Sequence, residues 1–378
     1  FESPEQMVEG VRVEHDSLGE RELPNAVYYG VQTQRALENF AISGVRLHNF
    51  EHMIEDLAFV KKAAALANGE LGVITAAQTR AIGEACDELL NGKLHEHFVV
   101  DMFQGGAGTS TNMNANEVMA NVALELTDHA LGDYDVVEPH DDLNMSQSTN
   151  DAYPTALKVA MLAGNDLVVR EAEQLVAALR AKGGEFLEIV KIGRTELQDA
   201  VPMTVGQEFH AFAAALEDEI AFLRDAERAL LTVNMGATAI GSGINAPEGY
   251  AERVPVHLEA ITGKPFVKAN DLFGATWDQH AFVAESGALK SFAVKLSKIA
   301  SDLILLSSGP RAGLGEINLP AQQPGSSIMP GKVNPVIPEL VNVVAFRVMS
   351  NDFAVTLAAQ HGQLQLNAYE PIEAIAIL

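Results

Sequence analysis

Apolar residues recur at helical spacing through most of the second half of the chain. In LKSFAVKLSKIASDLILL they are separated alternately by three and four residues, as in a helix that packs along its length against another helix. Three stripes have this kind of spacing: Leu289, Phe292, Leu296, Ile299, Leu303 and Leu306; Phe212, Leu216, Ile220, Leu223 and Leu230; and Val168, Ala172, Leu175 and Leu179. These stripes predict several long helices packed side by side in a bundle.

Prolines indicate where two of these helices begin, because proline fits the first turn of a helix. Pro154 would open the helix that carries the Val168 stripe. Pro335 and Pro338 would open another helix, which runs towards Leu378.

The first part of the chain has a more mixed pattern. Residues 55–90 are predicted to be helical, whereas residues 1–50 are rich in turn-forming residues, most densely in LGERELPNAVYYG. We therefore predict a mainly α protein with two domains. A mixed N-terminal domain would cover residues 1–147, and a long-helix bundle would cover residues 148–378.

The charge balance limits the class of partner. Aspartate and glutamate total 51 against 25 lysines and arginines, which gives a net charge of -26. Such a charge argues against nucleic acid and against an anionic membrane surface as partners. No run of 18 uncharged apolar residues is present, so no membrane span is expected. An anionic substrate would need a pocket that is locally positive.

The single cysteine, Cys86, cannot form a disulfide within the chain. It lies in AIGEACDELL, which favours a small core residue over a nucleophile. We expect a reducing compartment, the cytoplasm.

Four polar stretches interrupt the helical background, and each is rich in glycine or in hydroxyl and amide side chains. They are GGAGTSTNMNANE (residues 105–117), NMSQSTNDAYPT (144–155), GRTELQDAVPMT (193–204) and GSSIMPGKVNP (325–335). A further stretch, GATAIGSGINAP (236–247), has the same character.

The common motifs do not explain these stretches. The lysine of GSSIMPGKVNP is followed by Val333, and five residues separate its two glycines, so it is not a phosphate-binding P-loop. GATAIGSGIN lacks the glycine order of a dinucleotide-binding turn. The 11 histidines form no H-E-x-x-H motif, and G-x-S-x-G is absent.

The polar stretches do share a position, at or near the start of a predicted helix. Helix N-termini offer free N–H groups and a partial positive charge. Several converging N-termini together with Lys332 would bind a dicarboxylate without a basic surface. The candidate donors are Thr109, Ser148, Thr149, Asn150, Thr195, Ser326 and Asn334. The alternative is that these residues only cap helices, which is the commonest role of such residues.

The same stretches resemble a known family. GSSIMPGKVNP looks like the signature of the fumarase/aspartase superfamily, and SSGPRAGLGEINLP, GATAIGSGIN, GRTELQDAVPMTVGQE, SQSTNDAYPT, GGAGTSTNMNANE and YYGVQTQRALENF are similar to other parts of that family. The resemblance extends from about residue 14 to residue 371. GAGTSTNMN, STND and QLQLNAYEP resemble the aspartase forms more than the fumarase forms.

The resemblance implies a fold of three domains, of which we expect the small C-terminal one to be absent here. It also implies a homotetramer around a twenty-helix core, with each active site built from three subunits. The implied reaction is the reversible conversion of L-aspartate to fumarate and ammonia through an aci-carboxylate. The alternatives are a fumarase and a non-catalytic helical assembly. We expect no cofactor, and activation by a divalent cation is left open.

The resemblance also implies roles for the candidate residues. Ser326 would be the base that removes the Cβ proton, and Lys332 and Asn334 would bind a carboxylate and help to hold the loop. The carboxylates and amino group would be held by Thr109, Ser148, Thr149, Asn150 and Thr195. Glu196 departs from the family pattern, which has histidine or glutamine at this position. It would attract the ammonium group and repel a carboxylate.

Overall fold

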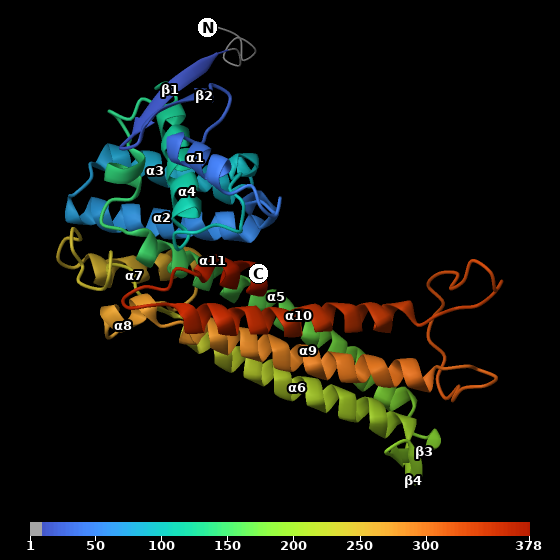
Figure 1. Cartoon of the computed structure of the whole chain (residues 1–378). Coiled ribbons are helices and arrows are strands. Elements are labelled where there is room, and N and C mark those ends of the chain that lie inside the picture. The colour runs from blue at the N-terminus through green and yellow to red at the C-terminus, as the bar shows by residue number, and fades with distance from the viewer. Residues whose placement is uncertain (1–9) are drawn as a thin grey trace.

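The computed structural model describes residues 10–378 and is mainly helical (Figure 1). The helices are α1 (Val31–Asn39), α2 (Glu51–Leu71), α3 (Ala76–Leu90), α4 (Thr109–Leu126), α5 (Thr149–Glu185), α6 (Val205–Leu230), α7 (Tyr250–Thr262), α8 (Leu272–Trp277), α9 (His280–Leu306), α10 (Val336–His361) and α11 (Glu370–Ile377). The strands are β1 (Val11–Asp16), β2 (Gly19–Pro24), β3 (Val190–Thr195), β4 (Gln198–Thr204), β5 (Thr232–Val233) and β6 (Val267–Lys268). They pair only as two-stranded sheets, β1–β2 and β3–β4 antiparallel and β5–β6 parallel.

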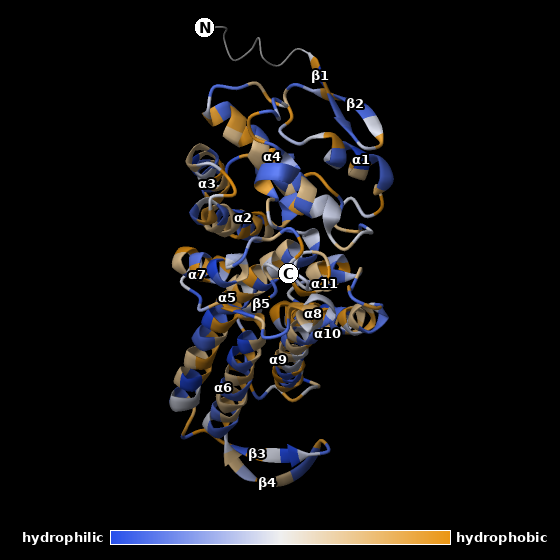
Figure 2. Ribbon diagram, turned by 90° about the vertical axis from the view of Figure 1, so that its left-hand side faces the viewer, coloured by the Kyte–Doolittle hydropathy of each residue, from blue (hydrophilic) through white to orange (hydrophobic). Residues whose placement is uncertain are grey.

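The molecule has two parts, a head and an arm. The head contains α1 to α4, and the arm is the bundle of α5, α6, α9 and α10 (Figures 1 and 2). The arm tip, farthest from the head, consists of the β3–β4 hairpin and residues 307–335. The prediction of a mainly α fold with a long-helix bundle is confirmed.

The predicted stripes on α6 and α9 lie in helices, and most of their residues are buried in the core of the arm. The stripe on α5 differs by one position. Leu175 is exposed, and Val169 and Val176 take part in the core instead. The α5 surface that faces α6 and α9 is therefore rotated slightly from the predicted one, which a pattern of short residues such as Ala172 does not fix.

The start of α5 was predicted wrongly at Pro154. The helix begins five residues earlier because Ser148 caps it: its Oγ accepts a hydrogen bond from the Asn150 N–H, and the Asp151 side chain accepts one from the Ser148 N–H. A proline inside a helix leaves the carbonyl four residues before it without its usual partner. Here Asn234 Nδ2 donates to the Asn150 carbonyl at 3.0 Å and supplies that missing bond.

The predicted helix over residues 55–90 is two helices. Gly72 ends α2 in a left-handed conformation with φ 72°, and Thr75 caps α3 by accepting a hydrogen bond from the Gln78 N–H. The turn between them lets α3 fold back on α2, so both helices contribute buried side chains to the head.

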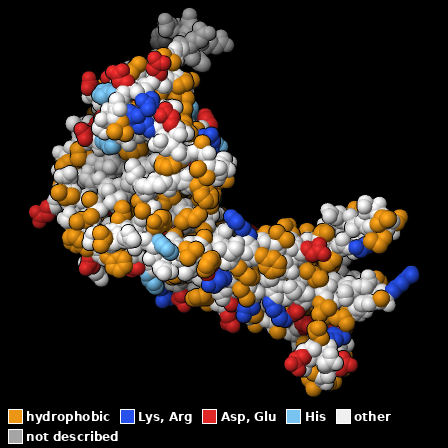
Figure 3. All heavy atoms as spheres, in the orientation of Figure 1, with side chains coloured by type: hydrophobic (Ala, Val, Ile, Leu, Met, Phe, Trp, Pro, Cys, Tyr) orange, Lys and Arg blue, Asp and Glu red, His pale blue; other side chains and the backbone are white. Residues whose placement is uncertain are grey.

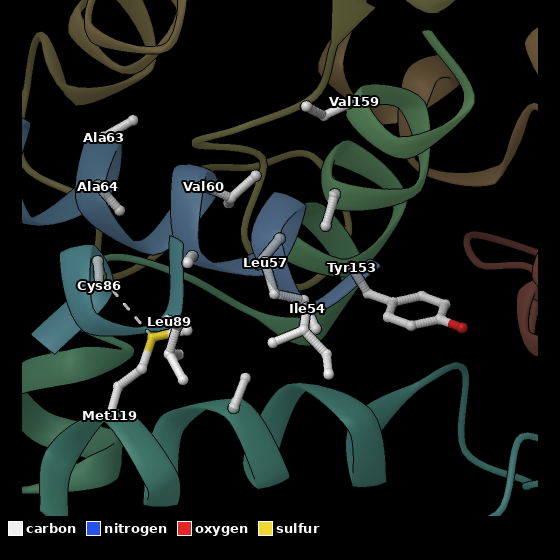
Figure 4. Close-up of a cluster of buried hydrophobic side chains, with 14 of the residues drawn as sticks. Ile54, Leu57, Val60, Ala63, Ala64, Cys86, Leu89, Met119, Tyr153 and Val159 are labelled. Carbon is white, nitrogen blue, oxygen red and sulfur yellow. Dashed lines mark hydrogen bonds between the residues drawn. The ribbon is translucent and has the colours of Figure 1, made fainter. Parts of the chain in front are cut away.

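The core of the head is formed by α2, α3, α4 and the first turns of α5, and α7 and the start of α9 add buried side chains to it (Figure 4). Cys86 is fully buried in it, with its Sγ 3.8 Å from the Met119 Sδ. Burial raises the pKa of the Cys86 thiol to about 12, so the thiolate is scarce at neutral pH. The prediction that Cys86 is a core residue is confirmed.

The turn-rich prediction covered residues 1–50, of which residues 1–9 lie outside the described residues, and residues 10–50 are more regular than predicted. The β1–β2 hairpin occupies residues 11–24, and α1 follows it. Glu117 on α4 accepts hydrogen bonds from the backbone N–H groups of Gly30, Gln32 and Thr33, which ties the start of α1 to α4.

The last predicted helix also ends early. α10 begins after Pro335, as expected, but stops at His361. Asn367 packs against Gly362 and its Nδ2 donates to the Ala358 carbonyl, which satisfies a group at the helix end. The chain then turns before α11.

The cores of head and arm meet within α5. Residues up to Leu162 belong to the head core, and residues from Val169 onward belong to the arm core. One continuous helix thus connects the two parts. The domain division at residue 147 stays a prediction, and it lies one residue before the cap of this helix.

Candidate active site

The structure separates the predicted site residues into two groups. The junction group, at the head end of α5, comprises Thr109, Ser148, Thr149 and Asn150. The tip group, at the arm tip, comprises Thr195, Glu196, Ser326, Lys332 and Asn334. Because α5 has 37 residues and runs from one group to the other, they lie about 55 Å apart along the helix.

In the junction group, the start of α4 lies against the first turns of α5. Gly108 precedes Thr109 with φ 84°, and a Cβ placed there would lie 2.5 Å from the Tyr153 ring. Only glycine fits this contact. Thr109 itself is exposed, and its Oγ1 donates to the Gly106 carbonyl.

The start of α5 is tied to the stretch at residues 236–247. Asp151 is fully buried and accepts hydrogen bonds from the N–H groups of Gly236 at 3.1 Å and Thr238 at 2.8 Å. Asn150 Nδ2 donates to the Ala239 carbonyl at 2.7 Å. The fifth polar stretch of the sequence is therefore a wall of the junction group.

A buried polar network lies beneath these residues, and sequence reasoning missed it. Lys61 of α2 donates to the side-chain oxygens of Asn144 and Gln147, at 3.0 and 2.9 Å. Asn112 of α4 donates to Asn144 at 3.1 Å and to Thr149 Oγ1 at 3.2 Å. Burial lowers the pKa of Lys61 to about 7. Two features of the sequence could have indicated this network: Lys61 in the alanine-rich run VKKAAALAN, and Asn112 and Asn116, which are four residues apart in NMNAN.

In the tip group, Thr195 and Glu196 lie at the turn of the β3–β4 hairpin and are exposed. Glu196 and Leu197 have φ 53° and 63°, as the two central residues of a tight hairpin turn require. This conformation carries strain for residues other than glycine. The hairpin lies at the end of the arm farthest from the head (Figure 1).

Ser326 lies in the loop that precedes α10. Its Oγ accepts hydrogen bonds from the backbone N–H groups of Ile328 at 3.2 Å and Met329 at 2.9 Å. The loop is closed at its base, where Asn334 Nδ2 donates to the Gly325 carbonyl at 3.0 Å. Lys332 is exposed.

Ion pairs connect the hairpin to the segment before this loop. Lys191 of β3 lies 2.8 Å from Glu208 and 3.0 Å from Glu316, and Arg194 also pairs with Glu316. The hydrogen bond from Arg194, with the Lys191 charge, holds the pKa of Glu316 below its usual range. The two parts of the tip group are thereby held at the same end of the arm.

Neither group alone makes a complete site. The junction group offers hydroxyl and amide donors at two helix N-termini above a buried lysine, which suits a carboxylate. The tip group offers a serine oxygen that already accepts two N–H groups, a lysine and an amide. A cavity of about 750 Å³ between the β1–β2 turn, α1 and the start of α4 is lined by none of the predicted residues. Within residues 10–378, no three His, Cys, Asp or Glu side chains are placed to hold a metal ion.

Comparison with known proteins adds an independent line of evidence. A model of the lyase family matches residues 19–350. Aspartate ammonia-lyase of Pseudomonas aeruginosa is 58% identical over 97% of this chain and 77% of its own length. Aspartate ammonia-lyase of Escherichia coli is 53% identical, with the same two coverages.

Two solved structures are similar over 97% of this chain and 80% of their own. The cobalt-bound fumarate lyase:delta crystallin from Brucella melitensis has a TM-score of 0.95 at 56% identity. A class II fumarase from Schistosoma mansoni has a TM-score of 0.93 at 36% identity.

Proposed function

This chain belongs to the lyase family, and from that premise we propose that it is an aspartate ammonia-lyase, which converts L-aspartate reversibly to fumarate and ammonia. It is a carbon–nitrogen lyase. The observation that carries the proposal is the 53–58% identity to aspartate ammonia-lyases over nearly the whole chain. A fumarase is the second candidate, and the 36% identity to the Schistosoma enzyme supports it less.

The proposed reaction depends more on hydrogen-bond donors that stabilise negative charge than on acidic side chains. Ser326, as an alkoxide, would take the Cβ proton of L-aspartate, and the bonding electrons would move into the neighbouring carboxylate to give an aci-carboxylate with two negative charges. The C–N bond then breaks, the C=C bond forms, and the nitrogen leaves with the bonding pair as ammonia. Donors aimed at the developing charge would stabilise it, each by roughly 3–4 kcal/mol.

The surroundings of Ser326 support its assignment as the base. A serine hydroxyl is a weak base at neutral pH, so the alkoxide must be stabilised. The N–H groups of Ile328 and Met329 point at its oxygen, and Lys332 lies six residues further along the same loop. Closure of the loop would remove water and strengthen these interactions.

In the proposed enzyme, subunits share each active site. The junction and tip groups lie at opposite ends of α5, so one chain cannot bring them together. A second copy packed along the arm would do so, and α10 offers the surface. Many of its large apolar side chains are exposed (Figure 3): Ile337, Leu340, Val343, Val344, Phe346, Phe353 and Leu357.

The helix α10 is unusually apolar for its length. By length and composition alone, α10 is the one helix in the described residues that could cross a membrane. It carries Glu339, Arg347 and Asp352, and it packs along α9 through pairs such as Lys290 with Asp352. We propose a homotetramer in which these apolar faces meet, and we place the enzyme in the cytoplasm without a membrane or nucleic-acid partner.

Mixed refolding tests the shared site. Asn150→Ala and Ser326→Ala, each inactive alone, are unfolded, mixed in equal amounts and refolded. If the two residues of one site come from different subunits, roughly one site in four will keep both of them, and activity will return to about that fraction. Well-formed oligomers without activity would place both residues of a site in one subunit.

An activity assay tests the function itself. The protein is incubated separately with L-aspartate and with L-malate, and fumarate is followed by its ultraviolet absorbance. We expect fumarate from L-aspartate and little from L-malate. The reverse preference would favour the fumarase. Addition of a chelator to the same assay measures any activation by a divalent cation.

A further inference from the structure

Lys61 is the starting point, because it is a fully buried lysine that the proposed reaction does not use. Its Nζ donates to the side-chain oxygens of Asn144 and Gln147. An amide side chain has one accepting oxygen and one donating NH₂ group. The lysine therefore orients both amides, with their oxygens towards it.

The fixed orientation of the Asn144 amide in turn fixes the amide of Asn112. The Asn144 oxygen, held towards Lys61, also accepts from Nδ2 of Asn112 at 3.1 Å and of Asn116 at 3.2 Å. If the Asn112 amide were reversed, its oxygen would face the oxygen of Asn144, which is repulsive. Asn112 is thus fixed with its NH₂ group towards Asn144.

The same NH₂ group also reaches Thr149. One hydrogen of Asn112 Nδ2 serves Asn144, and the other serves Thr149 Oγ1 at 3.2 Å. A threonine hydroxyl has one hydrogen and two lone pairs. Because Thr149 accepts from Asn112, its own hydrogen is free to be donated in another direction.

We propose that Lys61, Asn144 and Asn112 are positioning residues that orient the Thr149 hydroxyl as a hydrogen-bond donor to a substrate carboxylate. This inference rests on the proposed function, which makes Thr149 a substrate-binding residue. A carboxylate can only accept, so a hydroxyl that keeps its hydrogen available needs no change of partner when the substrate binds.

A double-mutant cycle tests whether Asn112 acts through Thr149. Thr149→Val removes the hydroxyl and keeps the shape, and we expect kcat/KM for L-aspartate to fall roughly 10- to 100-fold. Asn112→Ala should lower kcat/KM about tenfold in the wild-type background and less than about twofold in the Thr149→Val background. Equal losses in both backgrounds would overturn the proposal.

Two further variants separate positioning from mere support of the fold. Thr149→Ser retains the hydroxyl and should recover most of the lost kcat/KM. Asn114→Ala is the matched control, because Asn114 is a buried asparagine of α4 whose bonds go to His97 and Val99 instead. It should lower the unfolding temperature without changing kcat/KM. A loss of kcat/KM in this control as large as that of Asn112→Ala would overturn the proposal.

Lys61→Met tests the start of the network. Removal of the lysine leaves the partly buried side-chain oxygens of Asn144 and Gln147 short of a donor and lets the Asn144 amide reverse. We expect kcat/KM to fall about tenfold, with less than a further twofold loss when Asn112→Ala is added. Independent effects of the two substitutions would contradict a connected network. Should Lys61→Met fail to fold, the Asn112 and Thr149 cycle still decides the question.

The proposal can fail separately from the proposed function. If the wild-type protein does not deaminate L-aspartate, the proposed function fails. The same cycle is then measured as succinate affinity by calorimetry, since succinate presents two carboxylates. Coupling between Asn112 and Thr149 in succinate binding would keep the positioning role. Additive effects of the two substitutions on succinate affinity, or no succinate binding by the wild type, would overturn the positioning role.

Discussion

The junction group and the tip group are built in opposite ways. At the junction, two helix N-termini are packed against each other, and two of their side chains are buried and bonded: Thr149 accepts from the Asn112 side chain, and Asp151 accepts from the backbone N–H groups of Gly236 and Thr238. At the tip, the candidate residues lie on a hairpin turn and a glycine-containing loop that are mostly exposed. Well-supported candidate donors therefore lie at one end of the arm, and the candidate base, Ser326, lies in a lightly supported loop at the other.

The difference suggests a division of labour. Donors that stabilise charge are most effective when they are already oriented, because no energy is then spent on orienting them during the reaction. A loop that must admit substrate and then exclude water is better left with few contacts, since such segments open easily. The four predictions that follow test this contrast, from the largest expected effect to the smallest.

Ser326→Ala should lower kcat roughly 10²- to 10⁴-fold, the usual range for loss of a general base. Helicity and assembly should be unchanged, because the serine is not part of either core. Circular dichroism and gel filtration measure these alongside the fumarate assay. Ser17→Ala, an exposed serine of the β1–β2 turn, is the control. Near-normal turnover of Ser326→Ala would remove Ser326 as the base.

Substitution of one positive-φ glycine in each group measures how much added bulk the junction group and the tip group tolerate. Gly108→Ala should cost about 2–4 kcal/mol, because the left-handed conformation is strained and the new Cβ meets the Tyr153 ring. Gly331 has φ 81°, but no heavy atom lies within 4 Å of its Cβ position, so Gly331→Ala should cost only about 1 kcal/mol. Urea unfolding at one fixed protein concentration measures both. Equal costs would contradict the contrast.

The two ends should also respond to pH in opposite directions. Near the junction, burial and then the Glu370 charge raise the pKa of Glu373 from 4.5 to about 9, and its carboxylate has no hydrogen-bond partner within residues 10–378. Its ionisation is therefore unfavourable in the folded protein, and stability falls as pH rises from about 4.5 to about 9. Glu373→Gln should stabilise the protein at pH 8, by about 1–3 kcal/mol, and have little effect at pH 4.

Glu316 at the tip gives the reverse case. Its pKa is held below 4.5 by the hydrogen bond from Arg194, so its contribution is present above that pH and is lost as pH falls through the folded pKa. Glu316→Gln should therefore lower the stability of the protein at pH 7 and leave it unchanged at acid pH. The loss should be smaller than the gain from Glu373→Gln. Thermal unfolding across this range measures both variants. A pH-independent effect of either substitution would contradict its electrostatic origin.

The smallest effect is expected at Glu196. A carboxylate beside the substrate ammonium lowers the KM for L-aspartate and does nothing for the hydroxyl of malate. Glu196→Gln should raise the KM for L-aspartate roughly two- to fivefold, as for a partly exposed ion pair, without creating fumarase activity. The neighbouring Leu197→Ala controls for changes in the hairpin turn. An unchanged KM would exclude contact between Glu196 and the amino group.

Much of this protein could be predicted from the sequence alone. The apolar spacing of α6 and α9 predicts two arm helices, because a helical stripe of Leu, Ile and Phe is stable only when it packs against another helix. The motifs of the polar stretches indicated the family. The prediction that the candidate donors lie at helix starts is confirmed for Thr109 and Thr149, whereas Thr195 lies at the β3–β4 turn and Ser326 lies ten residues before α10. Helix ends were less certain, since Ser148 and Gly72 decide them through single local contacts.

Only the tertiary structure decided which polar residues meet. Pro154 stays inside α5 because Asn234, 80 residues away in the chain, satisfies the Asn150 carbonyl. Hydrogen bonds of Asn144 and Asn112 connect Lys61 of α2 with Thr149 of α5. No periodic pattern in the sequence predicts hydrogen bonds between residues so far apart in the chain. They depend on how the packed helices place individual atoms. For the same reason the sequence predicted donors of one site, and the fold distributed them between the two ends of a long helix.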